Sequence, residues 1–384
     1  MNYFSSSFKL GILGGGQLGK MLLYSTRKFD IYTCVLEANT EAPCKIACNE
    51  FHLGDLMDFD AVYNFGKLVD VLTIEIENVN VDALEALEKE GIKVYPASKT
   101  LRIIQNKATQ KLFYTDHNLP TAPFTRFAFL SEIEDAIENG GLAFPFVWKA
   151  AKFGYDGNGV KIVKQLSDLE KLPKGECIAE ALIPFKNELA VIVARNASGD
   201  TKTYPVVEME FHPEANQVEY VICPARIPNM IAEKAKAVAL KTSEAFNHVG
   251  LLAVEMFLTQ DDTILINEVA PRPHNSGHQT IEASYTSQFE QHIRAILNLP
   301  LGKTDSKVGG VMVNLVGAEG YTGNVIYENI EPIMKMEGVT PHIYGKKQTR
   351  PFRKMGHVTV VNEDLSEARR IAEEVKKAIK VINL

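Results

Sequence analysis

The chain has 384 residues, of which 46% are hydrophobic and 23% are charged, and its formal net charge is −7. This length exceeds what one hydrophobic core supports, so we expect two or three domains. The apolar runs are short, so no membrane span is expected, and an acidic chain is poorly suited to binding nucleic acid. The polar start of the chain and five scattered cysteines favour a cytoplasmic protein.

The first hundred residues alternate short apolar runs with helical patterns. This alternation predicts an α/β region with a parallel sheet. The expected strands span residues 9–13, 32–36, 70–74 and 92–95. A charged helical stretch at 99–112 and the proline-bracketed segment 120–123 follow, and they mark the first domain boundary.

A glycine loop, Gly14–Gly19, follows the first predicted strand and has the spacing G-x-G-x-x-G, with Glu37 near the end of the next strand. That pattern fits a dinucleotide site. Small residues and a helix N-terminus attract an anion without selecting a dinucleotide, however. A plain tight turn stays open, and contact with a substrate phosphate or ribose is the favoured interpretation.

The middle of the chain, from about 124 to 299, is rich in predicted strands, with helices expected at 231–246 and 287–297. We therefore expect an α+β region. The last part contains a predicted strand at 311–316 and an amphipathic helix at 365–379.

A second glycine-rich loop, residues 153–160, lies between two apolar runs and predicts a mobile hairpin lid. Its backbone N–H groups can fold over phosphates, and Lys149 precedes it at the end of a strand. The alternative is a solvent hairpin beside an ordinary surface lysine. Further on, the apolar segment 180–183 can pair with an adenine edge, and Glu188 can accept ribose hydroxyls.

The run 253–268 predicts a hairpin that turns at Asp261 and Asp262. A register symmetric about that turn places Phe257 opposite Ile266 and Glu255 opposite Glu268. Opposed carboxylates repel, so the pair calls for a cation. With the amide oxygen of Asn267, the oxygen set suits Mg²⁺. A register slip that sends one carboxylate to solvent is the alternative, and a pair for acid/base catalysis is disfavoured.

The next segment, 270–278, concentrates polar side chains in nine residues. Arg272 suits bidentate contact with phosphate or carboxylate oxygens. His274 and His278 fit either a functional or a structural role. The density of polar groups favours a functional loop.

These motifs, in this order, resemble the ATP-grasp superfamily. Within it, the chain is similar to the enzymes that carboxylate 5-aminoimidazole ribonucleotide in purine biosynthesis. GGGQLG at 14–19, Glu75-Ile76-Glu77-Asn78, the NSGH loop at 275–278 and RKMGH at 353–357 extend the likeness over nearly the whole chain. The resemblance implies a homodimer with three domains. These are a Rossmann-like pre-ATP-grasp domain at 1–105, an ATP-grasp domain at 106–299 with its lid at about 124–185, and a small C-terminal domain at 300–384.

The resemblance also implies roles for individual residues. Glu255 and Glu268 would hold Mg²⁺, and Tyr155, Asp156 and Arg272 would be catalytic. The residues implied to bind ATP are Lys107, Lys149, Gly154, Tyr155, Asp156, Gly157, Asn158, Gly159, Val160, Glu180, Ala181, Leu182, Ile183, Glu188, Asn267 and Glu268. The residues implied to bind the ribonucleotide are Gln17, Leu18, Glu75, Asn275, Lys346, Arg353 and Lys354.

The implied reaction uses ATP and bicarbonate to make carboxyphosphate, whose carboxyl group passes to the amine of 5-aminoimidazole ribonucleotide. Two departures from the family pattern stand out. Asn158 replaces a basic residue, and Phe211 takes a histidine position beside His212; replacement of that histidine by His212 and its loss both stay open. Rival interpretations are a formate-dependent glycinamide ribonucleotide transformylase, an NAD-dependent oxidoreductase and a nucleotide sensor without turnover.

Overall fold

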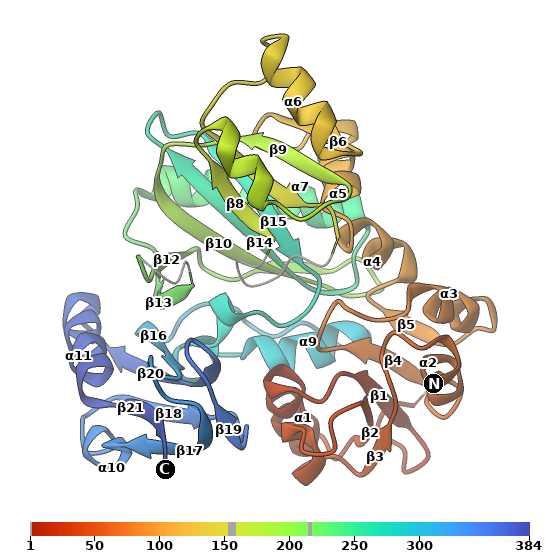
Figure 1. Ribbon diagram of the computed structural model, residues 1–384. Helices are drawn as coiled ribbons and strands as arrows, with labels where there is room; N and C mark the ends of the chain where they lie inside the picture. Colours follow the sequence, from red (N-terminus) through yellow and green to blue (C-terminus); the bar gives the residue numbers. More distant parts are fainter. Residues whose placement is uncertain (1, 153–158, 214–216) are drawn as a thin grey trace.

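The computed structural model describes residues 2–152, 159–213 and 217–384 (Figure 1). The N-terminal part is a five-stranded parallel sheet of order β3-β2-β1-β4-β5. Its strands are β1 (Lys9–Leu13), β2 (Tyr32–Glu37), β3 (Glu50–Leu53), β4 (Val71–Ile74) and β5 (Lys93–Tyr95). Its helices are α1 (Gln17–Lys28), η1 (Pro43–Ile46), α2 (Phe59–Gly66) and α3 (Val81–Lys89). The predicted α/β region is confirmed.

The helical stretch predicted at 99–112 is divided into α4 (Ser98–Ile104) and α5 (Lys107–Asp116). The helical prediction is confirmed, and the stretch is divided because Gln105 caps the end of α4 and Asn106 caps the start of α5. Its side-chain oxygen accepts a hydrogen bond from the backbone N–H of Thr109 at 3.0 Å. The cap places Lys107 in the first turn of α5.

A four-stranded antiparallel sheet of order β6-β9-β7-β8 projects at the top of Figure 1. Its strands are β6 (Phe124–Phe127), β7 (Phe146–Ala150), β8 (Val160–Val163) and β9 (Cys177–Ala181), with α6 (Leu130–Glu138) and η2 (Leu166–Lys171). The predicted hairpin is confirmed, since β7 pairs with β8. The predicted loop residues 153–158 lie outside the described residues.

A nine-stranded sheet forms the centre of the molecule, in the order β15-β14-β10-β12-β13-β16-β20-β18, with β11 on β10. Its first strands are β10 (Phe185–Arg195), β11 (Thr201–Thr203), β12 (Val207–Phe211), β13 (Val218–Cys223), β14 (Gly250–Thr259) and β15 (Ile264–Ala270). The C-terminal strands that continue it are β16 (Gly309–Val316), β18 (Val339–Ile343) and β20 (Lys354–Asn362). The C-terminal region is therefore joined to the middle region by the pairing of β13 with β16.

Helices cover both faces of this sheet. Ile231, Ala235 and Ala239 of α7 (Asn229–Phe246) share a core with β10, β14 and β15. On the other face, α9 (Gln288–Ile296) packs on β14 and also against α1, so it joins the central sheet to the N-terminal part. The short η3 (Asn275–Gly277) and α8 (Thr280–Ala283) precede it.

At the C-terminal end, α11 (Leu365–Ala378) packs against β16 and β20. A small sheet of order β19-β17-β21 completes the fold with β17 (Gly323–Glu328), β19 (Gln348–Thr349), β21 (Lys380–Asn383) and α10 (Ile330–Ile333). In the part of the chain that the structure describes, we find no helix with the length and apolar character needed to cross a membrane.

Candidate active site

The hairpin of β14 and β15 carries the two predicted metal carboxylates. Glu255 lies directly opposite Glu268, as predicted. The predicted pairing of Phe257 with Ile266 was wrong, because Phe257 lies opposite Leu265. A β-bulge accounts for both results. The register shifts by one residue between Glu255 and Met256, and Asn267 is the extra residue.

The bulge also decides which face Glu268 occupies. Ile266 and Val269 both belong to the core shared with α7, although they are three residues apart and a regular strand alternates faces every residue. The extra residue makes this possible. Glu268 therefore turns to the face of Glu255, away from that core.

Other charged side chains surround the pair. Lys107 Nζ lies 2.6 Å from Glu268 Oε2, and His274 Nε2 lies 3.2 Å from Glu255 Oε1. Burial raises the pKa of Glu255, and the negative charges of Glu268 and Glu188 raise that pKa further. The ammonium of Lys107 holds the pKa of Glu268 well below its usual range. The cluster thus holds one ionised carboxylate beside one that favours its proton.

Lys149 of β7 reaches the hairpin at Asn267 and is also paired with Glu180 of β9. Lys149 Nζ lies 2.6 Å from Glu180 Oε2 and donates a hydrogen bond to Asn267 Oδ1 at 3.0 Å. A second lysine, Lys111, lies 2.5 Å from Glu180 Oε1. Burial raises the pKa of Glu180, but the two ammonium groups outweigh burial and lower that pKa overall.

Lys111 was not among the predicted site residues. Its signal was available, because Lys111 follows Lys107 by four residues and therefore shares its face of α5. The backbone of Ala181, Leu182 and Ile183 continues from Glu180 at the carboxyl end of β9, an inner strand of its sheet.

Glu188 lies on β10 beside Phe257 of β14, two residues from Ala190, which is the partner of Glu255. Burial raises the pKa of Glu188 to about 7, and the charge of Glu268 contributes to the rise. The structure therefore brings the predicted ATP residues on β7, β9, β10 and β15 to one site. Gly159 is also described, and Val160 pairs with Lys149, whereas Gly154, Tyr155, Asp156, Gly157 and Asn158 lie outside the described residues.

Arg272 connects this site with the N-terminal region. Its Nε lies 2.9 Å from Glu77 Oε2, and its Nη1 donates to the carbonyl of Pro273 at 3.0 Å. Its positive charge also acts on the carboxyl of Glu75. Glu77, to which no role was given from the sequence, thus holds a predicted catalytic arginine.

The backbone N–H groups of the glycine loop donate hydrogen bonds to two glutamate side chains. Glu75 accepts the backbone N–H groups of Gly16 and Gly19 at 3.1 and 2.9 Å, and Glu37 accepts that of Gly15 at 2.8 Å. A dinucleotide pyrophosphate would need these same donors. The arrangement opposes the NAD interpretation. Gln17 and Leu18 belong to this segment and form the start of α1.

The predicted basic residues of the C-terminal region are only partly brought together. Lys346 Nζ donates to the carbonyl of Lys354 at 2.8 Å, and the charge of Lys354 acts on Glu255. Arg353 instead donates through Nη1 to the carbonyl of Gln348 at 2.6 Å. Asn275 exchanges side-chain hydrogen bonds of 2.9 Å with Asn314 of β16.

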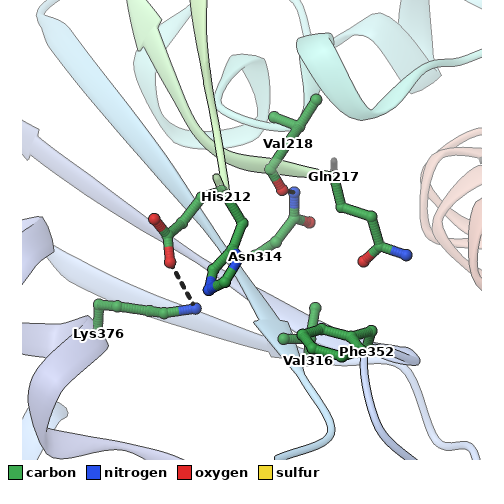
Figure 2. Close-up of a pocket in the computed structure, with 8 residues that line it drawn as sticks. His212, Gln217, Val218, Asn314, Val316, Phe352 and Lys376 are labelled. Atoms are coloured by element: carbon green, nitrogen blue, oxygen red, sulfur yellow. Dashed lines mark hydrogen bonds and ion pairs between the residues drawn. The ribbon is translucent and has the colours of Figure 1, made fainter. Parts of the chain in front are cut away.

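A small cavity lies beside Asn314 (Figure 2), and the side chain of Asn314 donates to the carbonyl of Val218 at 2.8 Å. His212 lines this cavity, with its ring 6.0 Å from that of Phe352. Phe211 packs instead against the apolar cluster of β12 and β13. Of the two neighbouring residues, His212 is the one that lines this cavity.

Three family models match the chain in sequence. They are the ribonucleotide synthetase preATP-grasp domain at residues 8–105, the ATP-grasp domain at 112–289 and the phosphoribosylaminoimidazole carboxylase C-terminal domain at 310–371.

Individual relatives agree with these matches. The N5-carboxyaminoimidazole ribonucleotide synthase of Bacillus subtilis is 38% identical over 93% of this chain and 92% of its own length. The chain spans only 65% of the longer phosphoribosylaminoimidazole carboxylase of Candida albicans.

Solved structures of relatives have the same fold. The N5-carboxyaminoimidazole ribonucleotide synthetase of Thermotoga maritima superposes with a TM-score of 0.90 at 43% identity, over 98% of this chain and 100% of that one. The Aspergillus clavatus synthase, solved with ADP and 5-aminoimidazole ribonucleotide, gives 0.88 at 34% identity, over 97% and 98%. The chain belongs to the N5-carboxyaminoimidazole ribonucleotide synthase family, whose members are ATP-dependent ligases of the ATP-grasp type in purine biosynthesis.

Proposed function

We propose that this chain converts 5-aminoimidazole ribonucleotide to N5-carboxyaminoimidazole ribonucleotide with ATP, and that bicarbonate supplies the carboxyl group. The observation that carries the proposal is the bulged hairpin, which places Glu255 and Glu268 face to face beside Lys107 and Lys149. Opposed acids with lysines around them suit a phosphate chain that arrives with a divalent cation.

In this proposal, ATP lies along β9 and over the acidic hairpin. Lys107 and Lys149 bind its phosphates as point charges. The backbone of 180–183 follows the adenine edge, and Glu188 accepts the ribose hydroxyls. The raised pKa of Glu188 agrees with a carboxyl in a site shielded from water.

The hairpin residues fit a magnesium ion. Glu255 and Glu268 supply two carboxylates, Asn267 supplies an amide oxygen, and all three share one face because of the bulge. Repulsion from Glu268 contributes to the raised pKa of Glu255, which is the sign of a pair that a cation would relieve. When bound, Mg²⁺ neutralises charge on the phosphate oxygens during transfer.

The proposed chemistry has two steps. A bicarbonate oxygen attacks the γ-phosphorus of ATP, which gives carboxyphosphate and ADP. The amine of 5-aminoimidazole ribonucleotide then takes the carboxyl group, and inorganic phosphate leaves. Arg272 holds the bicarbonate and the carboxyphosphate, because a guanidinium suits planar oxyanions and Glu77 fixes its orientation.

The amine must lose a proton in the second step, and we assign its acceptance to Asp156 and the orientation of the amine to Tyr155. Carboxyphosphate is hydrolysed by water, so the segment 154–160 would cover the site during both steps. The ribonucleotide is bound by the following residues: Gln17, Leu18, Glu75, Asn275, Lys346, Arg353 and Lys354. The homodimer, the domain boundaries and the cytoplasmic location stay predictions.

The decisive experiment measures ADP release by the purified protein. We expect 5-aminoimidazole ribonucleotide to stimulate release in bicarbonate buffer, with one carboxylated product per ADP. Formate with glycinamide ribonucleotide should give no product. If formate with glycinamide ribonucleotide stimulated ADP release, and bicarbonate with 5-aminoimidazole ribonucleotide did not, the transformylase reaction would replace the proposal.

A further inference from the structure

A row of three polar side chains crosses the C-terminal strands of the central sheet. Asn314 of β16 lies opposite His357 of β20, and His357 lies opposite His342 of β18. Side chains opposite one another on neighbouring strands point to the same face. The three therefore form one continuous line across three strands.

A second line of polar side chains faces this row. Asn275, His278 and Glu282 lie on the η3–α8 segment, at spacings of three and four residues, which place them on one side of a helical turn. This segment includes the NSGH sequence, whose histidine has no role in the proposed chemistry.

The two lines meet in three contacts, which we call the polar seam. Asn275 and Asn314 exchange two hydrogen bonds of 2.9 Å. The rings of His278 and His357 stack with their centroids 4.6 Å apart. Glu282 Oε1 lies 2.7 Å from His342 Nε2, and the His342 ring in turn stacks on His357 at 4.4 Å.

The middle contact of the seam is fixed from both sides. His278 and His357 are 1% and 0% exposed. Gln288 Nε2 lies 3.2 Å from His278 Nδ1, and the hydroxyl of Tyr344 lies 3.1 Å from His357 Nδ1. With both rings held in this way, the seam has little freedom to slide.

The seam lies next to the basic residues of the C-terminal region. Lys354 precedes His357 by three residues on β20, and its positive charge acts on both His278 and Glu255. Lys346 Nζ donates a hydrogen bond to the carbonyl of Lys354. The first contact of the seam is itself made by Asn275. A shift along the seam would therefore move Lys354 relative to Asn275.

We propose that the polar seam sets the position of Lys354 and Lys346 against Asn275, so that His278, His357 and His342 are positioning residues for the ribonucleotide. The inference rests on the proposed function. It assigns these imidazoles to binding of the ribonucleotide and to no step at the ATP phosphates, because none of them contacts Lys107, Lys149 or Glu268 through any interaction found among the described residues.

The test is steady-state kinetics with each substrate varied separately. For His278→Ala we expect the KM for 5-aminoimidazole ribonucleotide to rise by about 10- to 100-fold, the range typical of a displaced binding group, with the KM for ATP within about twofold. His342→Ala should raise the same KM by about threefold to tenfold. His342→Gln keeps a donor toward Glu282 and should restore most of the affinity.

The matched control is Arg369→Ala, which removes a 2.7 Å contact between α11 and Glu210 of β12, elsewhere on the C-terminal region. It should change neither KM. Equal changes in the two KM values, or none in a folded His342→Ala enzyme, would overturn the proposal. If His278→Ala does not fold, the His342 variants decide. A wild-type enzyme that the ribonucleotide does not stimulate would instead refute the proposed function.

Discussion

Two pairs of glutamates occupy the two ends of the site, and their surroundings differ. Glu37 and Glu75, the loop pair, accept backbone N–H groups of the glycine loop. Glu255 and Glu268, the hairpin pair, face each other and are held by flexible side chains. Fixed backbone donors satisfy a carboxylate permanently, whereas side chains and an opposed charge leave it able to take a ligand. Glu37 and Glu75 therefore fix the shape of the loop that belongs to the proposed ribonucleotide site, whereas Glu255 and Glu268 are available for a cation.

The substitution Glu268→Gln, in the hairpin pair, is expected to have the largest effect on activity. This change removes one charge from the proposed metal site, and we expect kcat to fall by about 10²- to 10³-fold, because electrostatic groups at a transferred phosphoryl contribute on that scale. Thermal unfolding should be nearly unchanged. Glu210→Gln, on β12 of the same sheet, is the control and should retain activity.

Metal binding by the same variant can be measured independently of turnover, with Mn²⁺ in place of Mg²⁺. Binding of Mn²⁺ with ADP, followed by proton relaxation of water, should weaken in Glu268→Gln and not in Glu210→Gln. Equal binding by both variants would remove Glu268 from the metal site without reference to turnover.

Lowering the pH is expected to reduce the stability of the fold through its buried histidines, before any effect of the two glutamate pairs can be measured. Burial lowers the pKa values of His248, His278, His292 and His357. The unfolded chain binds protons at these residues below about pH 6.5, so stability is complete above that pH and is lost as the pH falls, by up to about 1.4 kcal/mol per pH unit for each histidine.

Urea unfolding between pH 7.5 and 5 measures this loss. His292→Gln should reduce the slope of the free energy of unfolding against pH by the contribution of one of the four histidines. A midpoint that stays constant down to pH 5 would show that the four imidazoles are protonated as easily in the folded chain as in the unfolded one.

The loop pair is expected to act on stability. Glu75→Ala leaves the N–H groups of Gly16 and Gly19 without their acceptor, and we expect a loss of about 2–3 kcal/mol in the free energy of unfolding. Glu37→Ala removes the acceptor of the Gly15 N–H group and of the exposed Asn39 N–H group, but water can replace the acceptor at Asn39, so the change should cost about 1 kcal/mol. Urea titration of both variants measures the two losses in the free energy of unfolding. A larger loss in Glu37→Ala than in Glu75→Ala would contradict this account.

A change beside the ATP residues is Lys111→Met, which leaves Glu180 with Lys149 as its remaining ammonium partner among the described residues. Glu180 should then hold Lys149 more strongly and leave it less able to bind phosphate, and the KM for ATP should rise about tenfold, equivalent to about 1.4 kcal/mol. Lys236→Met on the exposed face of α7 is the control. An unchanged KM for ATP would show that Lys111 acts on stability alone.

Much of the fold was predictable, because periodicity locates long elements well. The helices α7, α9 and α11 and the strands β1, β2, β4 and β5 follow from apolar spacing. β3 was missed because Glu50–Leu53 is half-exposed and carries two charged or polar residues in four. The break at Asn106 was missed because a cap inside a helical pattern leaves no change in periodicity.

The opposition of Glu255 and Glu268 was predicted correctly for an incomplete reason. The turn is centred on Asp261, half a position before the predicted centre between Asp261 and Asp262, and the one-residue bulge at Asn267 compensates for this difference before Glu268 is reached. A bulge has no reliable signal in a single sequence, because it depends on what packs beneath each residue. The joining of β13 to β16 was likewise hidden, since a strand's partner far along the chain is not encoded in its own pattern.

The unbroken central sheet has a consequence for the shortest chain that can fold. If residues after α9 were removed, β13 would lose β16 and expose a row of unpaired backbone N–H and C=O groups along its edge. Its Val221 and Ile222 are fully buried in the complete chain, and such an edge invites pairing with other molecules. A shortened chain would therefore form aggregates in place of a smaller ATP-binding unit.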